Sequence, residues 1–336
     1  MTVLVTGGLG YIGSHTVVEL LNKNFNVVVL DNLSNSNLSV IKRINELCGE
    51  SFCFYKGDIL DSNVLNEIFR SHSIESVIHF AGLKSVSESI SKPIKYYNDN
   101  ISGTLNLLNV MNFFDVKKVI FSSSATVYGQ PQKIPLTEQC PIGGTTNPYG
   151  TSKFMIEKIL MDLSTSDAEW DITILRYFNP VGAHPSGLLG EEPKGTPNNL
   201  VPYLTKVAIG ELESLSIYGN DYNTVDGTGV RDFIHVCDLA TGHISALENM
   251  SGTKLKIYNL GTGVGTSVLN LIKTFENVNK VSVPYSITAR RDGDIGECWA
   301  DATLAMRELK WKAKYDLADM LRHAWNWQIK NPSRRK

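Results

Sequence analysis

The N-terminal stretch from Val3 to Leu21 constrains this chain more than any other. Three apolar residues, Val3 to Val5, predict a buried strand, and a helical pattern of apolar residues begins at about residue 12. Between them lie Gly7, Gly10 and Gly13, in a Gly-x-x-Gly-x-x-Gly spacing. A strand, a glycine turn and a helix N-terminus in this order form an anion cradle, because the backbone can approach a pyrophosphate and free helix N–H groups hold it. The stretch therefore predicts dinucleotide binding.

The next predicted strand, residues 26–30, ends in Asp31. An acid at this distance from the glycine turn accepts hydrogen bonds from the ribose hydroxyls of a bound dinucleotide. Its carboxylate also repels the 2′-phosphate that distinguishes NADP, so Asp31 favours NAD as the cofactor.

Predicted strands and helices alternate through the first half of the chain, which favours an α/β fold with a doubly wound, Rossmann-like parallel sheet. The strands are expected at 3–6, 26–30, 52–55, 76–80 and 117–122, and the helices at 12–23, 62–71, 94–112 and from about 149. From about residue 177 the chain becomes rich in Gly, Pro and Asn, which is typical of a smaller, loop-rich lobe.

These patterns predict two interleaved domains. An NAD-binding domain is expected over residues 1–176, with return segments near 232–260, and a substrate-binding domain over 177–336. Of the return segments, 232–239 and 256–260 are expected to rejoin the sheet.

The composition excludes several classes of protein. With 42% apolar and 20% charged residues in 336, the chain has the make-up of an ordinary globular protein. A formal net charge of −2 gives no electrostatic case for binding nucleic acid or an anionic membrane. The five cysteines contain no C-x-x-C pair, which favours reduced thiols in the cytoplasm over disulfides or a metal site. The first strand leaves no room for a signal peptide, and no apolar run approaches membrane-spanning length, so we expect a soluble intracellular protein.

Functional residues are expected directly after the strands, where a doubly wound sheet binds its ligands. Asp58 and Ile59 form either a surface turn or an adenine site, in which the carboxylate accepts the amino group and the side chain of Ile59 packs on the ring. Lys84 is placed to reach a phosphate or a ribose. His79 lies in an apolar strand and is interpreted as a satisfied core histidine, whereas Asn100 is a candidate to join neighbouring strand ends by hydrogen bonds.

Ser124, Tyr149 and Lys153 form the candidate catalytic group. Ser124 follows the fifth strand, and Tyr149 and Lys153 are four residues apart at the start of the next helix, so their side chains share one face. A free phenol has a pKa of about 10, but a nearby ammonium and a bound nicotinamide cation favour the phenolate. We predict Tyr149 as a general base, with Ser124 sharing or relaying the proton. The prediction depends on the position of the pair after a cofactor turn, because one Tyr-x-x-x-Lys is expected by chance.

The glycine turn, the serine and the Tyr-x-x-x-Lys pair together resemble the extended short-chain dehydrogenase/reductase superfamily. Three later segments resemble the UDP-galactose 4-epimerase family, and they read RYFNPVGAHPSG (176–187), PNNLVP (197–202) and YGNDYNTVDGTGVRDFIHV (218–236). The resemblance runs nearly from end to end. It implies a tightly held NAD, a UDP-sugar substrate and interconversion of 4-epimers through a transient 4-keto sugar. It also implies a homodimer in which helices at 94–112 and 149–163 pair into a four-helix interface.

Two sets of binding residues accompany the catalytic group. The predicted cofactor contacts are Gly7, Gly10, Tyr11, Ile12, Gly13, Asp31, Asn32, Asn35, Ser36, Asp58, Ile59, Phe80, Ala81, Gly82, Lys84, Asn100, Tyr177 and Phe178. The predicted substrate contacts are Asn179, Asn199, Leu200, Tyr218, Arg231, Arg291, Asp294 and Cys298. By the resemblance, the two arginines lie on the diphosphate, whose oxygens suit planar guanidinium groups, and the rest, except Cys298, hold uridine and its phosphates.

Two positions depart from some members of the family. Cys298 precedes Trp-Ala-Asp where some members carry a tyrosine. A smaller side chain leaves space for a 2-acetamido group, so UDP-GlcNAc and UDP-GalNAc are hypothesised as substrates beside UDP-Glc and UDP-Gal. The alternative is that Cys298 is a small buried packing residue. Asp99 stands where some relatives have asparagine, which leaves open any cofactor contact at that position.

Two other functions are alternatives for this sequence. A sugar-nucleotide 4,6-dehydratase shares this scaffold but needs an acid pair directly after the serine, where this chain has Ala125 and Thr126. A non-catalytic NAD-sensing protein need not keep Tyr149 and Lys153, and this chain has both. The sequence leaves open the preferred sugar and the pathway served, whether galactose use or polysaccharide biosynthesis.

Overall fold

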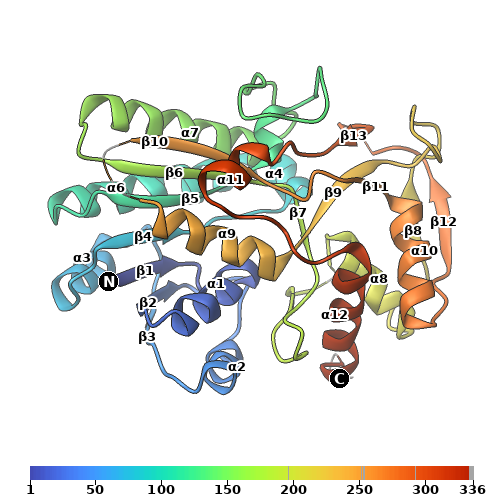
Figure 1. Ribbon diagram of the computed structural model, residues 1–336, viewed down its shortest axis with the longest axis horizontal. Coiled ribbons are helices and arrows are strands. Elements are labelled where there is room, and N and C mark those ends of the chain that lie inside the picture. Colours follow the sequence, from blue (N-terminus) through green and yellow to red (C-terminus); the bar gives the residue numbers. More distant parts are fainter. Residues whose placement is uncertain (196, 251, 253, 292, 333–336) are drawn as a thin grey trace.

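Seven parallel strands form the main sheet, in the order β10-β6-β5-β4-β1-β2-β3 (Figure 1). The computed structural model describes residues 1–195, 197–250, 252, 254–291 and 293–332. The strands are β1 (Thr2–Thr6), β2 (Asn26–Asp31), β3 (Cys53–Lys56), β4 (Ser76–His79), β5 (Lys118–Ser124), β6 (Asp171–Tyr177) and β10 (Leu255–Leu260). Most are nearly continuous apolar runs because both faces of a parallel sheet are covered by helices. The predicted α/β fold is confirmed.

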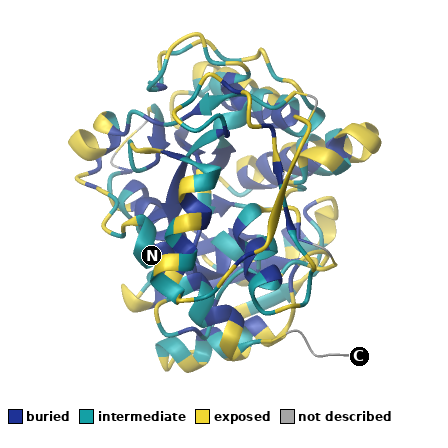
Figure 2. Cartoon of the chain, turned by 90° about the vertical axis from the view of Figure 1, so that its right-hand side faces the viewer, coloured by how far each residue is buried: buried dark blue, intermediate teal, exposed yellow. Residues whose placement is uncertain are grey.

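Helices cover the two faces of this sheet. One face is packed by α1 (Tyr11–Asn22), α2 (Ser39–Cys48), α9 (Val236–Glu248) and α11 (Thr303–Glu308), and the other by α3 (Ser62–Ser71), α6 (Gly103–Phe113) and α7 (Pro148–Ser166). Along β1 the side chains alternate, so that Val3 and Val5 enter the first core and Leu4 the second. Figure 2 shows the strands in dark blue inside helices that carry exposed positions.

The register of the sheet brings the ends of the central strands together. Thr6, the last residue of β1, is level with Leu30 on one side and with His79 on the other. The turns that follow β1, β2 and β4 therefore leave the sheet at one edge, where ligands bind in folds of this kind.

The helix predicted at 94–112 is interrupted. It consists of α5 (Pro93–Tyr97), a π-helical turn at Asn98–Ser102 and α6. A π turn is uncommon and is often found at functional sites, since its extra residue alters which side chains face inward. Here Asn100 within the turn is buried.

One predicted return segment joins a different sheet. Leu255–Leu260 pairs with β6 in the main sheet as expected, but β9 (Val230–His235) does not. It lies at the centre of a smaller sheet with β7 (Asn179–Val181), β11 (Gly265–Ser267) and β13 (Glu297–Cys298). The prediction that 232–239 rejoins the main sheet is therefore wrong for 232–235, whereas α9, which follows directly, does pack against α1.

A further group of elements gathers on the right of Figure 1. They are α8 (Leu200–Ala208), α10 (Val268–Asn279), α12 (Leu317–Lys330) and the two-stranded sheet of β8 (Leu215–Tyr218) and β12 (Tyr285–Thr288). Apolar side chains of α8, α10, α12 and β8 form a third core with Val181 of β7 and Phe233 of β9, whereas the residues of β12 are exposed. Within the described residues, no helix combines the length and the apolar character that a membrane crossing requires.

Candidate functional site

The glycine turn adopts the geometry of an anion cradle. Gly7 has a φ of +68°, and its N–H donates to the Leu30 carbonyl at 2.7 Å. A Cβ atom on Gly13 would lie 2.3 Å from the Gly7 carbonyl oxygen, so only glycine fits there. The helix α1 begins directly after Gly10, whose lack of a side chain leaves the first helical N–H groups, those of Tyr11 and Ile12, open to a ligand.

Asp31 lies beside this turn and fixes it. Its carboxylate accepts hydrogen bonds from Leu9 N at 3.0 Å, Leu33 N at 2.9 Å and Ser36 Oγ at 2.7 Å. The loop after β2 also meets the turn after β3, because Asn32 Nδ2 donates to Asp58 Oδ2 at 2.7 Å. The structure thus brings the predicted contacts after β1, β2 and β3 into one continuous edge.

The segment after β4 closes the other side of the cradle. The Gly7 Cβ position would lie only 2.8 Å from Ala81 N, so the two turns are in close contact. Asn100 Oδ1 accepts from Leu83 N at 2.7 Å, and its Nδ2 donates to Leu83 O and to Ser152 Oγ. Asn100 therefore joins the segment that holds Phe80, Ala81 and Gly82 to α7, rather than to another strand end.

His79 and Asp99 directly precede Phe80 and Asn100 in the sequence, and the structure shows the contacts of both. His79 is buried between Thr6 Oγ1 at 2.7 Å and Thr104 Oγ1 at 3.0 Å, and burial lowers its pKa to about 3. This confirms a satisfied core histidine. The Asp99 carboxylate pairs with Lys95 at 2.7 Å on the same helix.

Ser124, Tyr149 and Lys153 lie where β5 ends and α7 begins. Asn147 caps α7 by accepting from Gly150 N at 2.9 Å, which sets the position of Tyr149 in the first turn. The Lys153 ammonium is buried and donates to the Ser122 carbonyl at 2.7 Å. Ser124 Oγ accepts from Thr126 N at 3.2 Å and from Thr126 Oγ1 at 3.0 Å.

Burial dominates the protonation of this group. It raises the pKa of the Tyr149 phenol, and the Ser124 hydroxyl and the Lys84 ammonium act against that rise. Burial lowers the pKa of Lys153 to about 8, although the Glu157 carboxylate opposes the shift. The Lys153 ammonium therefore loses its proton more easily than a free lysine, and the charge of Lys84 is the one that acts on the Tyr149 phenol.

Glu157 was not predicted from the sequence. It lies one turn beyond Lys153 on α7 and binds Arg176 of β6 through Arg176 Nε at 3.1 Å and Nη2 at 2.8 Å. Both side chains are buried, and Ser123 also donates to Glu157. A helix spacing of four and eight residues after Tyr149 was the signal that could have identified this carboxylate.

Tyr177 and Phe178 follow β6 at the same edge. The Tyr177 phenol hydrogen bonds to His243, and burial raises its pKa. Phe178 packs in a small apolar cluster with Val127 and Cys298. This cluster places Cys298, a residue of the smaller sheet, beside the segment that follows Ser124.

The predicted diphosphate-binding residues gather on the smaller sheets. Arg231 lies in β9, level with Cys298 of β13, and the Asn179 position in β7 adjoins the same strand. The Arg291 guanidinium lies 4.6 Å from the centre of the Tyr218 ring and pairs with Asp294 at 2.8 Å. Arg290 stacks likewise on Tyr222, at 4.0 Å, and pairs with Asp221 at 2.7 Å. All three arginines act on the Tyr222 phenol, so they lie near one another.

Asn199 and Leu200 follow a long connection that contacts the cofactor side. We call residues 182–195 and 197–199 the crossing segment. Its contacts with the NAD-binding part join Tyr11 OH to Gly182 O (2.7 Å), Lys194 N to Asn35 Oδ1 (3.5 Å), Arg43 Nη1 to Glu192 Oε2 (3.1 Å), Asn198 Nδ2 to Ser85 Oγ (3.4 Å) and Lys84 Nζ to Glu191 Oε1 (2.9 Å). Glu191 also accepts from Asn199 Nδ2 at 2.7 Å and was missed by the sequence analysis, since a charged loop residue has no distinguishing pattern.

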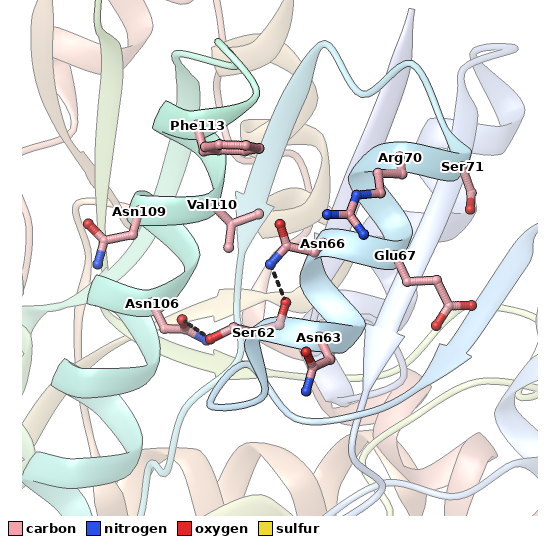
Figure 3. A pocket seen from close by; sticks show the side chains of 10 residues that line it. All are labelled: Ser62, Asn63, Asn66, Glu67, Arg70, Ser71, Asn106, Asn109, Val110 and Phe113. Atoms are coloured by element: carbon pink, nitrogen blue, oxygen red, sulfur yellow. Dashed lines mark hydrogen bonds between the residues drawn. The ribbon is translucent and has the colours of Figure 1, made fainter.

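An open groove of about 700 Å³ lies elsewhere, between α3 and α6 (Figure 3). Its polar lining includes Asn63, Asn66 and Arg70, and Phe113 stands at one end. At its base Asn106 accepts from Ser62 and donates to the Ile59 carbonyl at 2.6 Å, which fixes the turn after β3. The groove lies beside that turn, and the residues that line it include none of the predicted site residues.

The sequence and the fold of this chain match those of known proteins. A family model described as GDP-mannose 4,6 dehydratase matches residues 4–324. The chain is 60% identical over 333 residues to a UDP-glucose 4-epimerase of Yersinia enterocolitica, with 99% of each protein covered. The structure of UDP-glucose 4-epimerase from Bifidobacterium longum in complex with NAD+ and UDP is 53% identical, with a TM-score of 0.97 over 99% of each chain. That of the UDP-Glc/GlcNAc 4-epimerase from Campylobacter jejuni is 35% identical, with a TM-score of 0.85 over 98% of this chain and 99% of the other.

Identity at this level extends from one end of the chain to the other and is accompanied by the same fold. The chain belongs to the UDP-glucose 4-epimerase family of the extended short-chain dehydrogenase/reductase superfamily.

Proposed function

We propose that this protein is an NAD-dependent enzyme that interconverts UDP-glucose and UDP-galactose through a transient 4-keto sugar. The observation that carries the proposal is the position of Tyr149, which stands on one helix face with Lys153, next to Ser124 and behind a glycine cradle. The family membership supports it. So does the complex of the Bifidobacterium longum enzyme with NAD+ and UDP.

The residues at the sheet edge fit NAD. The cradle of Gly7, Gly10 and Gly13 suits a pyrophosphate, and the Asp31 carboxylate disfavours a 2′-phosphate beside it. When bound, NAD accepts hydride from C4 of the sugar and returns it. Phe80, Ala81 and Gly82 leave room for a ligand to lie against the backbone, and in this proposal Lys84 reaches a phosphate or a ribose.

The protein supplies the movement of the proton. Tyr149 takes the proton of the sugar 4-hydroxyl, and Ser124 shares it through a hydrogen bond. Burial raises the pKa of Tyr149, so the phenolate depends on positive charge around it. The Lys84 ammonium provides such charge from the protein, Lys153 on the same helix face as Tyr149 is proposed to add to it, and the nicotinamide cation of a bound NAD would add further.

The substrate side holds the nucleotide while the sugar turns. Arg231 and Arg291 are proposed to bind the diphosphate, and Tyr218, Asp294, Asn179, Asn199 and Leu200 to hold the uridine and its phosphates. A sugar held only through its nucleotide can present either face of C4 to one cofactor, which epimerisation requires.

Activity on UDP-GlcNAc and UDP-GalNAc is part of the proposal. Cys298 is a small side chain in the cluster with Phe178, where a tyrosine would fill space. Cys298→Tyr should lose turnover of the N-acetylated pair and keep that of UDP-Glc and UDP-Gal. Equal loss of both pairs would instead identify Cys298 as a packing residue.

Elimination of water, as in a 4,6-dehydratase, is not favoured. Ala125 and Thr126 begin a short 3₁₀ turn directly after Ser124 and carry no carboxyl group that could protonate a leaving hydroxyl. The family model named for a dehydratase therefore corresponds to the scaffold and not to this chemistry.

The test of the main proposal is a coupled epimerisation assay on the four UDP-sugars, with Tyr149→Phe as the comparison. The variant should lose about 10²-fold or more of kcat, the smaller end of general-base effects. An unchanged kcat in Tyr149→Phe would refute the mechanism. A scan for a reduced nicotinamide band after adding UDP-sugar would separate an enzyme from a protein that only senses NAD.

A cytoplasmic homodimer completes the proposal. All five cysteines are unpaired, as expected of a reducing compartment. Apolar side chains are exposed on α5, α6 and α7, with Ile94 83%, Leu105 41%, Phe113 75% and Met155 44% accessible. Sedimentation of the wild type and of Met155→Glu tests the pairing, and a wild-type monomer would exclude it.

A further inference from the structure

We infer that Glu191 is a positioning residue that joins the cofactor side of the site to the substrate side; the inference rests on the proposed function. One carboxylate oxygen, Oε1, accepts from the Lys84 ammonium at 2.9 Å and from the Asn199 amide at 2.7 Å. Lys84 follows β4 and belongs to the proposed cofactor contacts. Asn199 begins α8 and belongs to the proposed substrate contacts. One atom of the crossing segment therefore orients a group on each side.

The surroundings of Glu191 suit this role. Its side chain is only 9% exposed, whereas that of Lys84 is 48% exposed. Its own backbone carbonyl accepts from Trp327 Nε1 at 3.1 Å, which holds the residue from behind. An ammonium has three donors and an amide has a second N–H and a carbonyl, so Lys84 and Asn199 keep polar groups for ligands while Glu191 fixes their direction.

The same carboxylate acts on the charges near the phenol. It raises the pKa of Lys84 against the lowering effect of burial, and Lys84 in turn interacts with Tyr149 of α7. From α1, the Tyr11 phenol faces Glu191 across a cavity of about 20 Å³. From β6, the Tyr177 phenol faces Tyr149. Glu191 is thus the counter-charge of the lysine that supports the proposed base.

Glu192 provides a matched control. It is the next residue of the crossing segment and also forms an ion pair with the NAD-binding part, to Arg43 at 3.1 Å, but its side chain is 52% exposed. If these ion pairs only held the two parts of the chain together, replacing either glutamate would have the same effect on UDP binding. A positioning role is specific to Glu191.

The experiment measures two quantities on each holoenzyme: UDP binding by calorimetry, and kcat as a function of pH. The variants compared with the wild type are Glu191→Ala, Glu191→Gln, Asn199→Ala, Glu192→Ala and the double variant Glu191→Ala/Asn199→Ala. Glu191→Ala should weaken UDP binding about tenfold, the size of one hydrogen bond to a charged group. The double variant should bind UDP no more weakly than Asn199→Ala, because the effect of Glu191 acts through Asn199. Glu192→Ala should match the wild type.

Glu191→Gln separates charge from hydrogen bonding. Its amide oxygen still accepts from Asn199, so it should restore most of the UDP affinity. Without the counter-charge, Lys84 lowers the pKa of Tyr149 further, and the acidic limb of the kcat profile should move to lower pH. Glu191→Gln keeps the side-chain volume and gives a readout even if Glu191→Ala does not fold.

Additive effects in the double variant, or identical behaviour of the Glu191 and Glu192 variants, would overturn the inference. A wild type without epimerase activity would overturn the proposed function instead. UDP binding by the same variants would still test Glu191, because binding requires no turnover.

Discussion

Replacing Glu157 by glutamine should destabilise the whole fold. The Arg176 guanidinium and the Glu157 carboxylate are 1% and 0% exposed, and two hydrogen bonds join them. Glutamine retains one acceptor but no charge, so the variant leaves a buried guanidinium without its counter-ion. Removing one partner of a buried ion pair costs about 3–5 kcal/mol, which would be a large part of the free energy of unfolding.

The same structure predicts which second change compensates. In Glu157→Leu/Arg176→Met neither charge of this pair is left buried without its partner, and apolar pairs of similar volume commonly replace such ion pairs at little cost. Most of the stability lost in Glu157→Gln should therefore be recovered. The Tyr128 hydroxyl keeps its hydrogen bond to Asn259 Oδ1 at 2.6 Å in either variant.

Urea unfolding measures both variants. The midpoint should fall in Glu157→Gln with an unchanged slope, since the surface exposed on unfolding is the same. A loss below about 1 kcal/mol, less than an ordinary buried hydrogen-bond defect, would refute the reasoning, as would a double variant less stable than the single one. The pH profile gives an independent check, because Glu157 opposes the fall of the Lys153 pKa and its removal should move that pKa below about 8.

Two further predictions concern the cradle and the buried lysine. Gly13→Ala should purify with little bound dinucleotide, because its Cβ would lie 2.3 Å from the Gly7 carbonyl oxygen; Gly144→Ala, with nothing within 4 Å, is the control, and equal dinucleotide content in both would contradict the cradle. Lys153 has a folded pKa of about 8 against 10.5 for the free group, so protonation favours the unfolded chain and stability should rise by up to about 3 kcal/mol between pH 8 and 10.5. Lys153→Met should remove that part of the rise, and parallel stability profiles of the two proteins would show that Lys153 is not desolvated.

The parts of the molecule that depend on short-range geometry were predictable. The spacing of Gly7, Gly10 and Gly13 is set by one turn, and that of Tyr149 and Lys153 by one helical repeat, so both patterns are visible in the sequence. The π turn at Asn98–Ser102 was not predicted, because a single extra residue hardly changes apolar periodicity.

The pairing of strands that are distant in the sequence and the burial of charged side chains were harder to predict from the sequence. The alternation of apolar and polar residues predicts a strand at 232–235 but does not show which strands it pairs with. In the structure it pairs within the smaller sheet and not within the main one. Glu191 looks like an ordinary surface acid in the sequence, and the helix spacing of Glu157 places it on the face of Tyr149 and Lys153 without showing that it is buried. What distinguishes them is burial against Lys84 and Arg176, which lie far away along the chain.

The crossing segment has one more consequence. It contacts three segments of the proposed cofactor site, at Tyr11, Asn35 and Lys84, each through a different hydrogen bond or ion pair. In the proposed function, a coenzyme bound at the glycine turn would lie beside these segments. We expect its release to require several of the contacts to open at the same time, which becomes rarer as their number grows. The residence time of the coenzyme should therefore exceed the turnover time by a wide margin, so that it behaves as a prosthetic group recycled in place and needs no exchange with a free pool.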